Sequence, residues 1–235
     1  MNATGVNILP STAGELSPEV SQKVSEIHSC YVGLDRARIR ERYIDSVFGD
    51  CELKKTWKHA ATNFDDLEGC ESVKFLITVR HPASWLLALH KRPYHALQKV
   101  EKDFVKFIVQ PWKTVKRDRL DEIITTPIEL WNLKCKSYID FFDGFSNGKN
   151  IFIVRFEDFS QSQKKSLSEF LTSLGIQGVE FKEVVKSSKG DEKDVAWYRN
   201  YYGNELWRNE ISSEAWNLIK TRVDLRACSY FSYEM

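Results

Sequence analysis

The segment from Val73 to Val79 constrains the fold more than any other part of the chain. It reads V-K-F-L-I-T-V, a nearly continuous apolar run rich in β-branched and aromatic residues. Such a run is typical of a strand buried on both faces of a parallel sheet. Arg80 and His81 follow, and Pro82 has the fixed φ that suits the first turn of a helix. We therefore expect a central strand, a charged corner and then a helix.

A second segment has the same character. Ile151 to Val154 is an uninterrupted apolar run of strand length, and it is followed by the polar exit Arg155-Phe156-Glu157-Asp158. Helical stripes follow Pro127 and recur from Leu167 to Leu174, where Gly175 closes the helix. Strands and helices that alternate in this way predict an α/β domain with a mostly parallel sheet in three layers, in which both runs are interior strands.

Bulk properties set limits on the class of protein. A chain of 235 residues with 42% hydrophobic composition suits one domain, residues 1–235, of which residues 1–16 are expected to be a flexible segment. Lys and Arg number 34 against 33 Asp and Glu, so net charge gives no reason to expect a nucleic-acid partner. Any anion site has to be local.

Cysteine usage and hydropathy bear on the compartment. The five cysteines are scattered and show no C-x-x-C spacing, which argues against a disulfide framework or a zinc site and favours a reducing compartment. No apolar run approaches the roughly 18 residues of a membrane span, and the polar start M-N-A-T-G lacks the features of a signal peptide. The sequence thus predicts a cytoplasmic protein without a membrane span.

Arg80 is the first candidate for a functional residue. The carboxyl edge of a parallel sheet is where α/β proteins bind anionic ligands, and a guanidinium can grip a phosphate through two parallel hydrogen bonds. The alternative is an arginine that only caps the strand. The polar loop from Lys186 to Asp191 is open to the same two interpretations, an anion site or a surface loop.

Two other charged stretches are expected to face solvent. The arginines between Asp35 and Phe48 favour an exposed helix face over a binding patch. Lys113 to Asp121 is strongly charged and is expected to be an exposed loop or helix start.

In order along the chain, the segments K-T-W-K-H, F-L-I-T-V-R-H-P and I-F-I-V-R-F-E-D-F are followed by a Lys-Gly loop and a terminal amphipathic helix. Together they resemble the sulfotransferase family, whose members transfer sulfuryl groups from the donor PAPS, and the bacterial-type domain in particular. The resemblance covers roughly Lys54 to Tyr233. It implies a three-layer, P-loop-NTPase-like domain.

The resemblance also implies roles for single residues. Arg80 matches the arginine that binds the 3′-phosphate of the donor, and Lys189 with Gly190 matches the Lys-Gly loop that contacts the same phosphate. Phe156 stands where many members have an aromatic residue beside the adenine. His59 precedes Arg80 by 21 residues (80 minus 59) and matches the catalytic histidine, which makes it the candidate general base.

The sequence departs from the family in two places. The family has a serine eight positions after the arginine, where this chain has Ala88 (80 plus 8), and His90 could replace it only in part. The phosphosulfate-binding loop should come first, yet the only candidate is Thr4 to Leu9. It has Ala3 where a Lys or Arg belongs and Pro10 where the helix should run. We therefore expect either an N-terminally shortened chain or a degenerate member of the family.

Two functional classes stay open. The first is a PAPS-dependent sulfotransferase that acts on a hydroxyl or amine of a carbohydrate or small molecule, with no metal. The second is a non-catalytic, sulfotransferase-like binding or interaction domain that has lost donor use. A P-loop kinase is disfavoured because the sequence contains no G-x-x-x-x-G-K-[ST].

Overall fold

The computed structural model describes residues 18–30, 33, 35–50, 59–62, 73–94, 97–144, 150–176, 181–185 and 193–235. Several predictions from the sequence lie outside these residues. They are the flexible segment 1–16, the candidate loop Thr4 to Leu9 with Ala3 and Pro10, and the Lys189-Gly190 loop.

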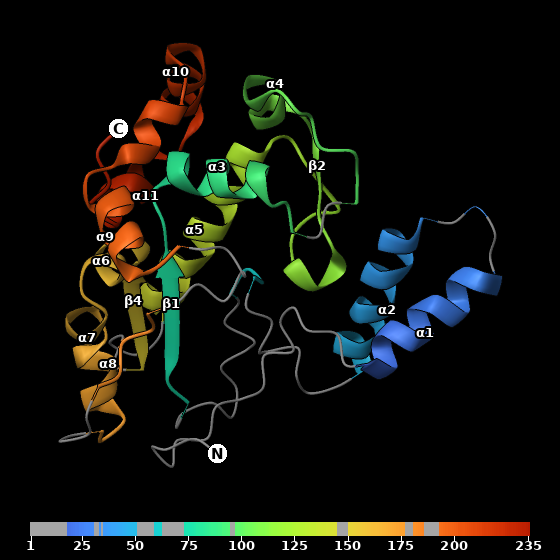
Figure 1. Cartoon of the computed structure of the whole chain (residues 1–235), viewed down its shortest axis with the longest axis horizontal. Helices are drawn as coiled ribbons and strands as arrows, with labels where there is room; N and C mark the ends of the chain where they lie inside the picture. Colours follow the sequence, from blue (N-terminus) through green and yellow to red (C-terminus); the bar gives the residue numbers. More distant parts are fainter. Residues whose placement is uncertain are drawn as a thin grey trace.

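The described chain is an α/β fold in which helices predominate (Figure 1). Its elements in chain order are α1 (Pro18–Cys30), α2 (Arg36–Asp50), β1 (Phe75–Val79), α3 (Pro82–Lys91), α4 (Phe104–Val109), β2 (Trp112–Lys113), the 3₁₀ turn η3 (Lys116–Asp118), β3 (Ile123–Ile124), α5 (Pro127–Gly144), β4 (Ile151–Arg155), α6 (Phe156–Gln161), α7 (Gln163–Ser166), α8 (Ser168–Ser173), α9 (Val195–Gly203), the 3₁₀ turn η5 (Leu206–Glu210), α10 (Ser213–Arg222) and α11 (Leu225–Tyr230). None of the described helices is both long and apolar enough to cross a lipid bilayer.

Both strands predicted from apolar runs are confirmed, and they pair with each other. β1 and β4 run parallel, with Phe75 opposite Ile151 and Val79 opposite Arg155. Figure 1 shows them side by side, with α3 leading away from the end of β1. Their carboxyl ends therefore lie together, and the corners that follow them share one edge.

The prediction that β1 is buried on both faces is wrong for the described residues. Val79 is buried, but Leu76 is 38% exposed and Thr78 is also exposed. Side chains alternate across a strand, so a sheet covered on one face leaves every second residue open. Among the described residues the parallel sheet has two strands, and the three-layer arrangement stays a prediction.

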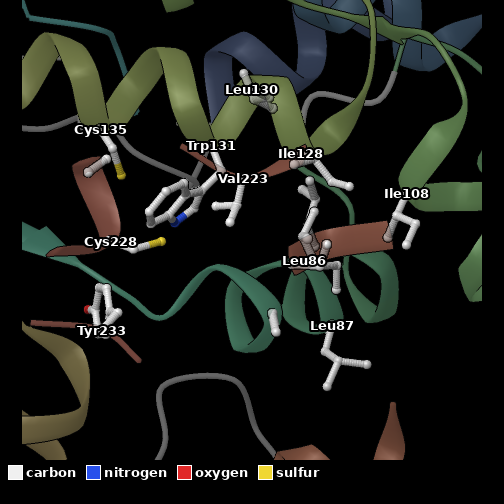
Figure 2. Close-up of a cluster of buried hydrophobic side chains, with 14 of the residues drawn as sticks. Leu86, Leu87, Ile108, Ile128, Leu130, Trp131, Cys135, Val223, Cys228 and Tyr233 are labelled. Carbon is white, nitrogen blue, oxygen red and sulfur yellow. The ribbon is translucent and has the colours of Figure 1, made fainter. Parts of the chain in front are cut away.

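The core lies beside the sheet, between helices distant in sequence. Figure 2 shows side chains of α3, α5 and the C-terminal helices pointing toward one another, among them Leu86, Trp131 and Cys228. Leu86 is fully buried, and Trp131 and Cys228 nearly so. The Trp131 indole nitrogen also donates a hydrogen bond of 3.0 Å to the carbonyl oxygen of Arg80. Core packing therefore fixes the backbone at the charged corner.

The charged stretch from Lys113 to Asp121 is exposed as predicted only in part: Lys113, Lys116 and Asp121 are exposed, but its centre is not. Arg117 and Asp118 are buried. The Arg117 guanidinium pairs with the carboxylates of Glu41 and Asp45 on α2. These partners are 76 and 72 positions away, respectively, so the local sequence could not indicate that the arginine is neutralised inside the protein.

His81 connects the corner between β1 and α3 to the C-terminal residues through polar contacts. Its Nδ1 accepts a 3.2 Å hydrogen bond from the Ala83 amide, which caps α3, and its Nε2 lies 3.2 Å from the Glu234 carbonyl oxygen. Its own amide donates to Glu157, whose other carboxylate oxygen accepts from the Tyr233 hydroxyl. The neutral imidazole with its proton on Nε2 satisfies both ring contacts.

Burial lowers the pKa of His81 to about 4, against 6.5 for an ordinary histidine. An unfolded chain would therefore take up this proton first as the pH falls. We expect the contribution of His81 to the free energy of unfolding to be complete above pH 6.5 and lost progressively toward pH 4, by about 3 kcal/mol in all. Denaturant unfolding across this pH range measures the loss.

The comparison is with His81→Asn, which keeps a side chain able to cap a helix but does not titrate. This variant should be less pH-sensitive than the wild type between pH 4 and 6.5, and the control His28→Asn, on the exposed part of α1, should not differ from the wild type. The same pH dependence in His81→Asn and wild type would show that His81 is not held neutral by the fold.

Candidate functional site

Arg80 lies at the carboxyl end of β1, where its half-buried side chain is held by neutral groups. Its Nε donates a 2.8 Å hydrogen bond to the Ser84 hydroxyl one helical turn later, and its terminal nitrogen donates to the Tyr202 hydroxyl. The guanidinium carbon also lies 4.7 Å from the ring centre of Tyr202 and 4.9 Å from that of Phe156. Within the described residues no carboxylate pairs with Arg80, so its positive charge is left for an anion.

Tyr202 is a fixed partner for this guanidinium. It is buried at the end of α9, and burial raises the pKa of its phenol, although the positive charge of Arg80 acts in the opposite direction. The phenol is therefore protonated at neutral pH, so its oxygen accepts from Arg80 without cancelling the charge. The pair is 122 positions apart in the sequence.

A cavity of about 420 Å³ opens beside Arg80. Aromatic rings make up much of its wall: Phe156, Phe159, Trp197, Tyr198, Tyr201 and Tyr202. Trp197 and Tyr201 stack with ring centres 4.5 Å apart, which supports that wall from within α9. Flat aromatic surfaces next to a guanidinium suit a ligand that combines a ring with an anionic group.

The charges along this cavity are mostly positive. Among the described residues that line it, four cations face one carboxylate: Arg80, Lys91, Arg92 and Lys193 against Asp194. Asp194 accepts a hydrogen bond from the Trp197 amide and so caps α9. Lys91 pairs with Glu210, and Lys193 lies 3.7 Å from the ring centre of Trp197. The cavity therefore favours anionic ligands over cationic ones.

A second cavity, of about 270 Å³, adjoins the first, since both are lined by Arg80 and Phe156. His59 lies in its wall, with its imidazole stacked on the Tyr94 ring at 4.4 Å between centres and 12° between planes. Lys134 lines it as well. The structure thus brings together Arg80, Phe156 and His59, three of the five residues singled out from the sequence.

The remaining two predicted residues, Lys189 and Gly190, lie outside the described residues. Their neighbours are informative, because Val184 and Val185 on one side and Lys193 and Asp194 on the other all line the larger cavity. The Val195 amide donates a 3.1 Å hydrogen bond to the Val185 carbonyl oxygen, which joins the two flanks. Convergence of Lys189 with Arg80 on one pocket stays a prediction.

Ala88 and His90, the residues at which the sequence departs from the family, both lie on α3. Ala88 lines the larger cavity and so brings a methyl group to its wall. His90 does not replace the missing hydroxyl. Its Nε2 lies 2.9 Å from the Glu101 carbonyl oxygen, and its ring packs against Phe107. Because α3 turns His90 away from Ala88, the prediction that His90 partly replaces the missing hydroxyl is wrong.

Sequence reasoning missed residues that belong to the site. Ser84 lies in the wall of the larger cavity but is fully buried, and its hydroxyl oxygen accepts a hydrogen bond from Arg80, so it orients the guanidinium. Its position four residues after Arg80, one helical turn away, was the sequence signal that could have identified it. Tyr202 and Lys134 come from distant helices, and no local pattern marks them.

Phe156 and Cys135 have more limited roles than their positions suggest. One side of Phe156 faces Arg80, and its ring meets Tyr202 edge to face with centres 4.9 Å apart. Only its remaining surface can contact a ligand. Cys135 lines the smaller cavity, but burial raises the pKa of its thiol well above the ordinary value. It is therefore a poor nucleophile.

Comparison with known proteins adds one structural likeness. No protein-family model matches the chain, and no curated protein matches it. Among solved structures, the sulfotransferase domain from the curacin biosynthetic pathway is similar, with 16% identity and a TM-score of 0.39 over 92% of this chain and 78% of that one. A likeness of this degree carries no argument about activity, so the assignment of function depends on the residues of the two cavities.

Proposed function

We propose that this chain is a sulfotransferase-like protein that binds the nucleotide of PAPS or its product PAP in the larger cavity. The 3′-phosphate lies against the Arg80 guanidinium, which Ser84 orients, and the adenine lies against the aromatic wall that includes the free side of Phe156. The match of Lys189 and Gly190 to the Lys-Gly motif of the family predicts that they contact the same phosphate. The acceptor occupies the smaller cavity beside His59.

The observation that carries the proposal is the position of Arg80. Its guanidinium, held by neutral partners, stands where an aromatic, cationic cavity adjoins a cavity that contains a histidine. A cation at the carboxyl edge of parallel strands is the expected place for a phosphate in an α/β fold. One nucleotide in the larger cavity would therefore leave the smaller one for a second substrate.

The same arrangement supports a group transfer. His59 accepts the proton of the acceptor hydroxyl or amine as the acceptor atom bonds to sulfur. The bond between sulfur and the bridging oxygen of the 5′-phosphate breaks, and PAP leaves with that electron pair. At about 270 Å³ the smaller cavity lies below the roughly 300–1,000 Å³ of drug-sized sites. A small-molecule acceptor therefore fits better than a carbohydrate chain.

The second candidate function is a non-catalytic domain that binds a nucleotide without using it as a donor. Ala88 favours this candidate, because it puts a methyl group in the cavity where the family places a hydroxyl donor. Catalysis of sulfuryl transfer depends mainly on groups that position the donor and stabilise its charge. Loss of this hydroxyl removes a hydrogen bond to a charged phosphate, which contributes about 1.5 to 3 kcal/mol to donor binding.

We expect weak binding of PAP that depends on Arg80. Arg80→Ala should raise the dissociation constant by about 10- to 100-fold, because a hydrogen bond to a charged group contributes about 1.5 to 3 kcal/mol. Isothermal titration calorimetry with PAP measures the change.

The matched control is Arg155→Ala. Arg155 ends the neighbouring strand opposite Val79, lies 3.6 Å from the Asp158 carboxylate and lines neither of the two cavities. It should leave the affinity unchanged, as should His59→Ala. Equal losses in Arg80→Ala and Arg155→Ala would place the nucleotide elsewhere or attribute its binding to general charge.

We expect slow sulfuryl transfer or none from PAPS, owing to Ala88 and to the departures at Ala3 and Pro10. Release of PAP in the presence of small hydroxyl and amine acceptors measures this rate. A slow rate that is abolished in His59→Ala supports an enzyme with His59 as base, and PAP binding without turnover supports the non-catalytic candidate. Rapid turnover would contradict the expected combined cost of these three departures.

A further inference from the structure

Lys134 is a buried cation in the wall of the smaller cavity that needs an explanation. It lies on α5 and is 5% exposed, and Asp118, whose carboxylate oxygen is 3.7 Å from its Nζ, is 1% exposed. A buried ion pair is often no more stabilising than two apolar residues of similar size. A role in the site would account for the pair better than stability does.

Lys134 contacts both the backbone of His59 and the ring on which His59 stacks. Its Nζ donates a 2.6 Å hydrogen bond to the His59 carbonyl oxygen and lies 3.4 Å from the Tyr94 hydroxyl. It is also 5.3 Å from the centre of the Tyr94 ring. One ammonium group therefore links the chain that carries the imidazole to the surface that orients it.

Residues of η3 and α5, the elements that carry Asp118 and Lys134, also hold the rest of the short segment 59–62. The Ala61 amide donates a 2.9 Å hydrogen bond to the carbonyl oxygen of Asp118. The Thr62 amide and hydroxyl bond to the Ser137 hydroxyl and carbonyl at 3.1 Å and 2.6 Å. Ser137 is less than one turn from Lys134 on α5. These contacts attach the segment to the protein, and Lys134 supplies a hydrogen bond at the His59 carbonyl oxygen.

The contacts of Lys134 also argue against a direct role in binding a ligand. An ammonium group has three N–H donors. Three acceptors surround this one, namely the His59 carbonyl, the Tyr94 hydroxyl and the Asp118 carboxylate. With its donors engaged, Lys134 acts on the site through its neighbours.

We propose that Lys134, paired with Asp118, is a positioning residue that fixes the imidazole of His59 in the smaller cavity beside Arg80. The inference rests on the proposed function for the meaning of that position, but the contact itself can be tested without turnover. Lys134 sets the placement of the segment and Tyr94 sets the plane of the ring. Burial lowers the pKa of Lys134, and the Asp118 carboxylate opposes that effect.

The test is an NMR measurement on the full chain with isotope-labelled histidine. The His59 resonance is assigned by its loss in His59→Asn. In the wild type, stacking on Tyr94 should shift the ring protons of His59 upfield, and Tyr94→Leu shows how much of this shift the Tyr94 ring provides. Lys134→Met should lose most of that part, and Lys134→Arg, which keeps a charged donor, should retain more of it than Lys134→Met.

The matched control is Lys136→Met, an exposed lysine on the same helix, which should leave the His59 resonance unchanged. If Lys134→Met does not fold, the double variant Asp118→Leu/Lys134→Met removes both charges and avoids leaving one unpaired in the interior. It should show the same loss. A wild-type His59 shift in a folded Lys134→Met or double variant overturns the proposal.

PAP titrations separate this inference from the proposed function. Lys134→Met should bind PAP as the wild type does, since Lys134 does not line the larger cavity. Absence of PAP binding in the wild type would refute the proposed function, whereas the NMR result would still decide whether Lys134 positions His59. A weakened PAP affinity in Lys134→Met would contradict its assignment to the smaller cavity.

Discussion

The hydrogen bonds and ring contacts that hold the Arg80 guanidinium are the interactions on which the candidate site depends. Ser84 and Tyr202 orient the charged group, and Trp131 fixes the backbone behind it. The next residue, His81, is attached through Glu157 and Glu234 to the second strand corner and to the end of the chain. The two cavities adjoin at this corner because β1 and β4 end together there.

Arg80 differs from the buried cations Arg117 and Lys134 in the groups that surround its charge. Arg117 pairs with Glu41 and Asp45, and Lys134 pairs with Asp118. Removing one partner of such a buried pair costs about 3 to 5 kcal/mol. Arg80 relies on neutral hydrogen bonds and two aromatic rings, contacts that contribute roughly 0.5 to 2 kcal/mol each. Its position at a cavity wall keeps it accessible to an anionic ligand.

The sequence predicted the parts of the fold that local patterns determine. The apolar runs gave both parallel strands, Pro82 marked the start of α3, and Gly175, with φ of +70°, lies just beyond α8 as a helix-ending glycine should. Burial was predicted less well. β1 is open on alternate residues, and the charged turn at Arg117 is buried because its partners come from α2.

The candidate site, like the fold, was predicted only in part. Arg80 could be identified from its place after a strand, and His59 and Phe156 from the order of motifs, and all three line adjoining cavities. Tyr202 and Lys134 could not, because they reach the site through tertiary packing across 122 and 75 positions. No periodicity in a single sequence contains that information.

A crystal structure of the protein with PAP bound is the most direct test of the central claim that Arg80 is the anchor of a nucleotide site. The account predicts oxygens of the 3′-phosphate within about 3 Å of the Arg80 guanidinium, with the adenine against the aromatic wall formed by α9 and Phe156. PAP bound elsewhere, or bound in the larger cavity with no phosphate oxygen in hydrogen-bonding reach of Arg80, would contradict it.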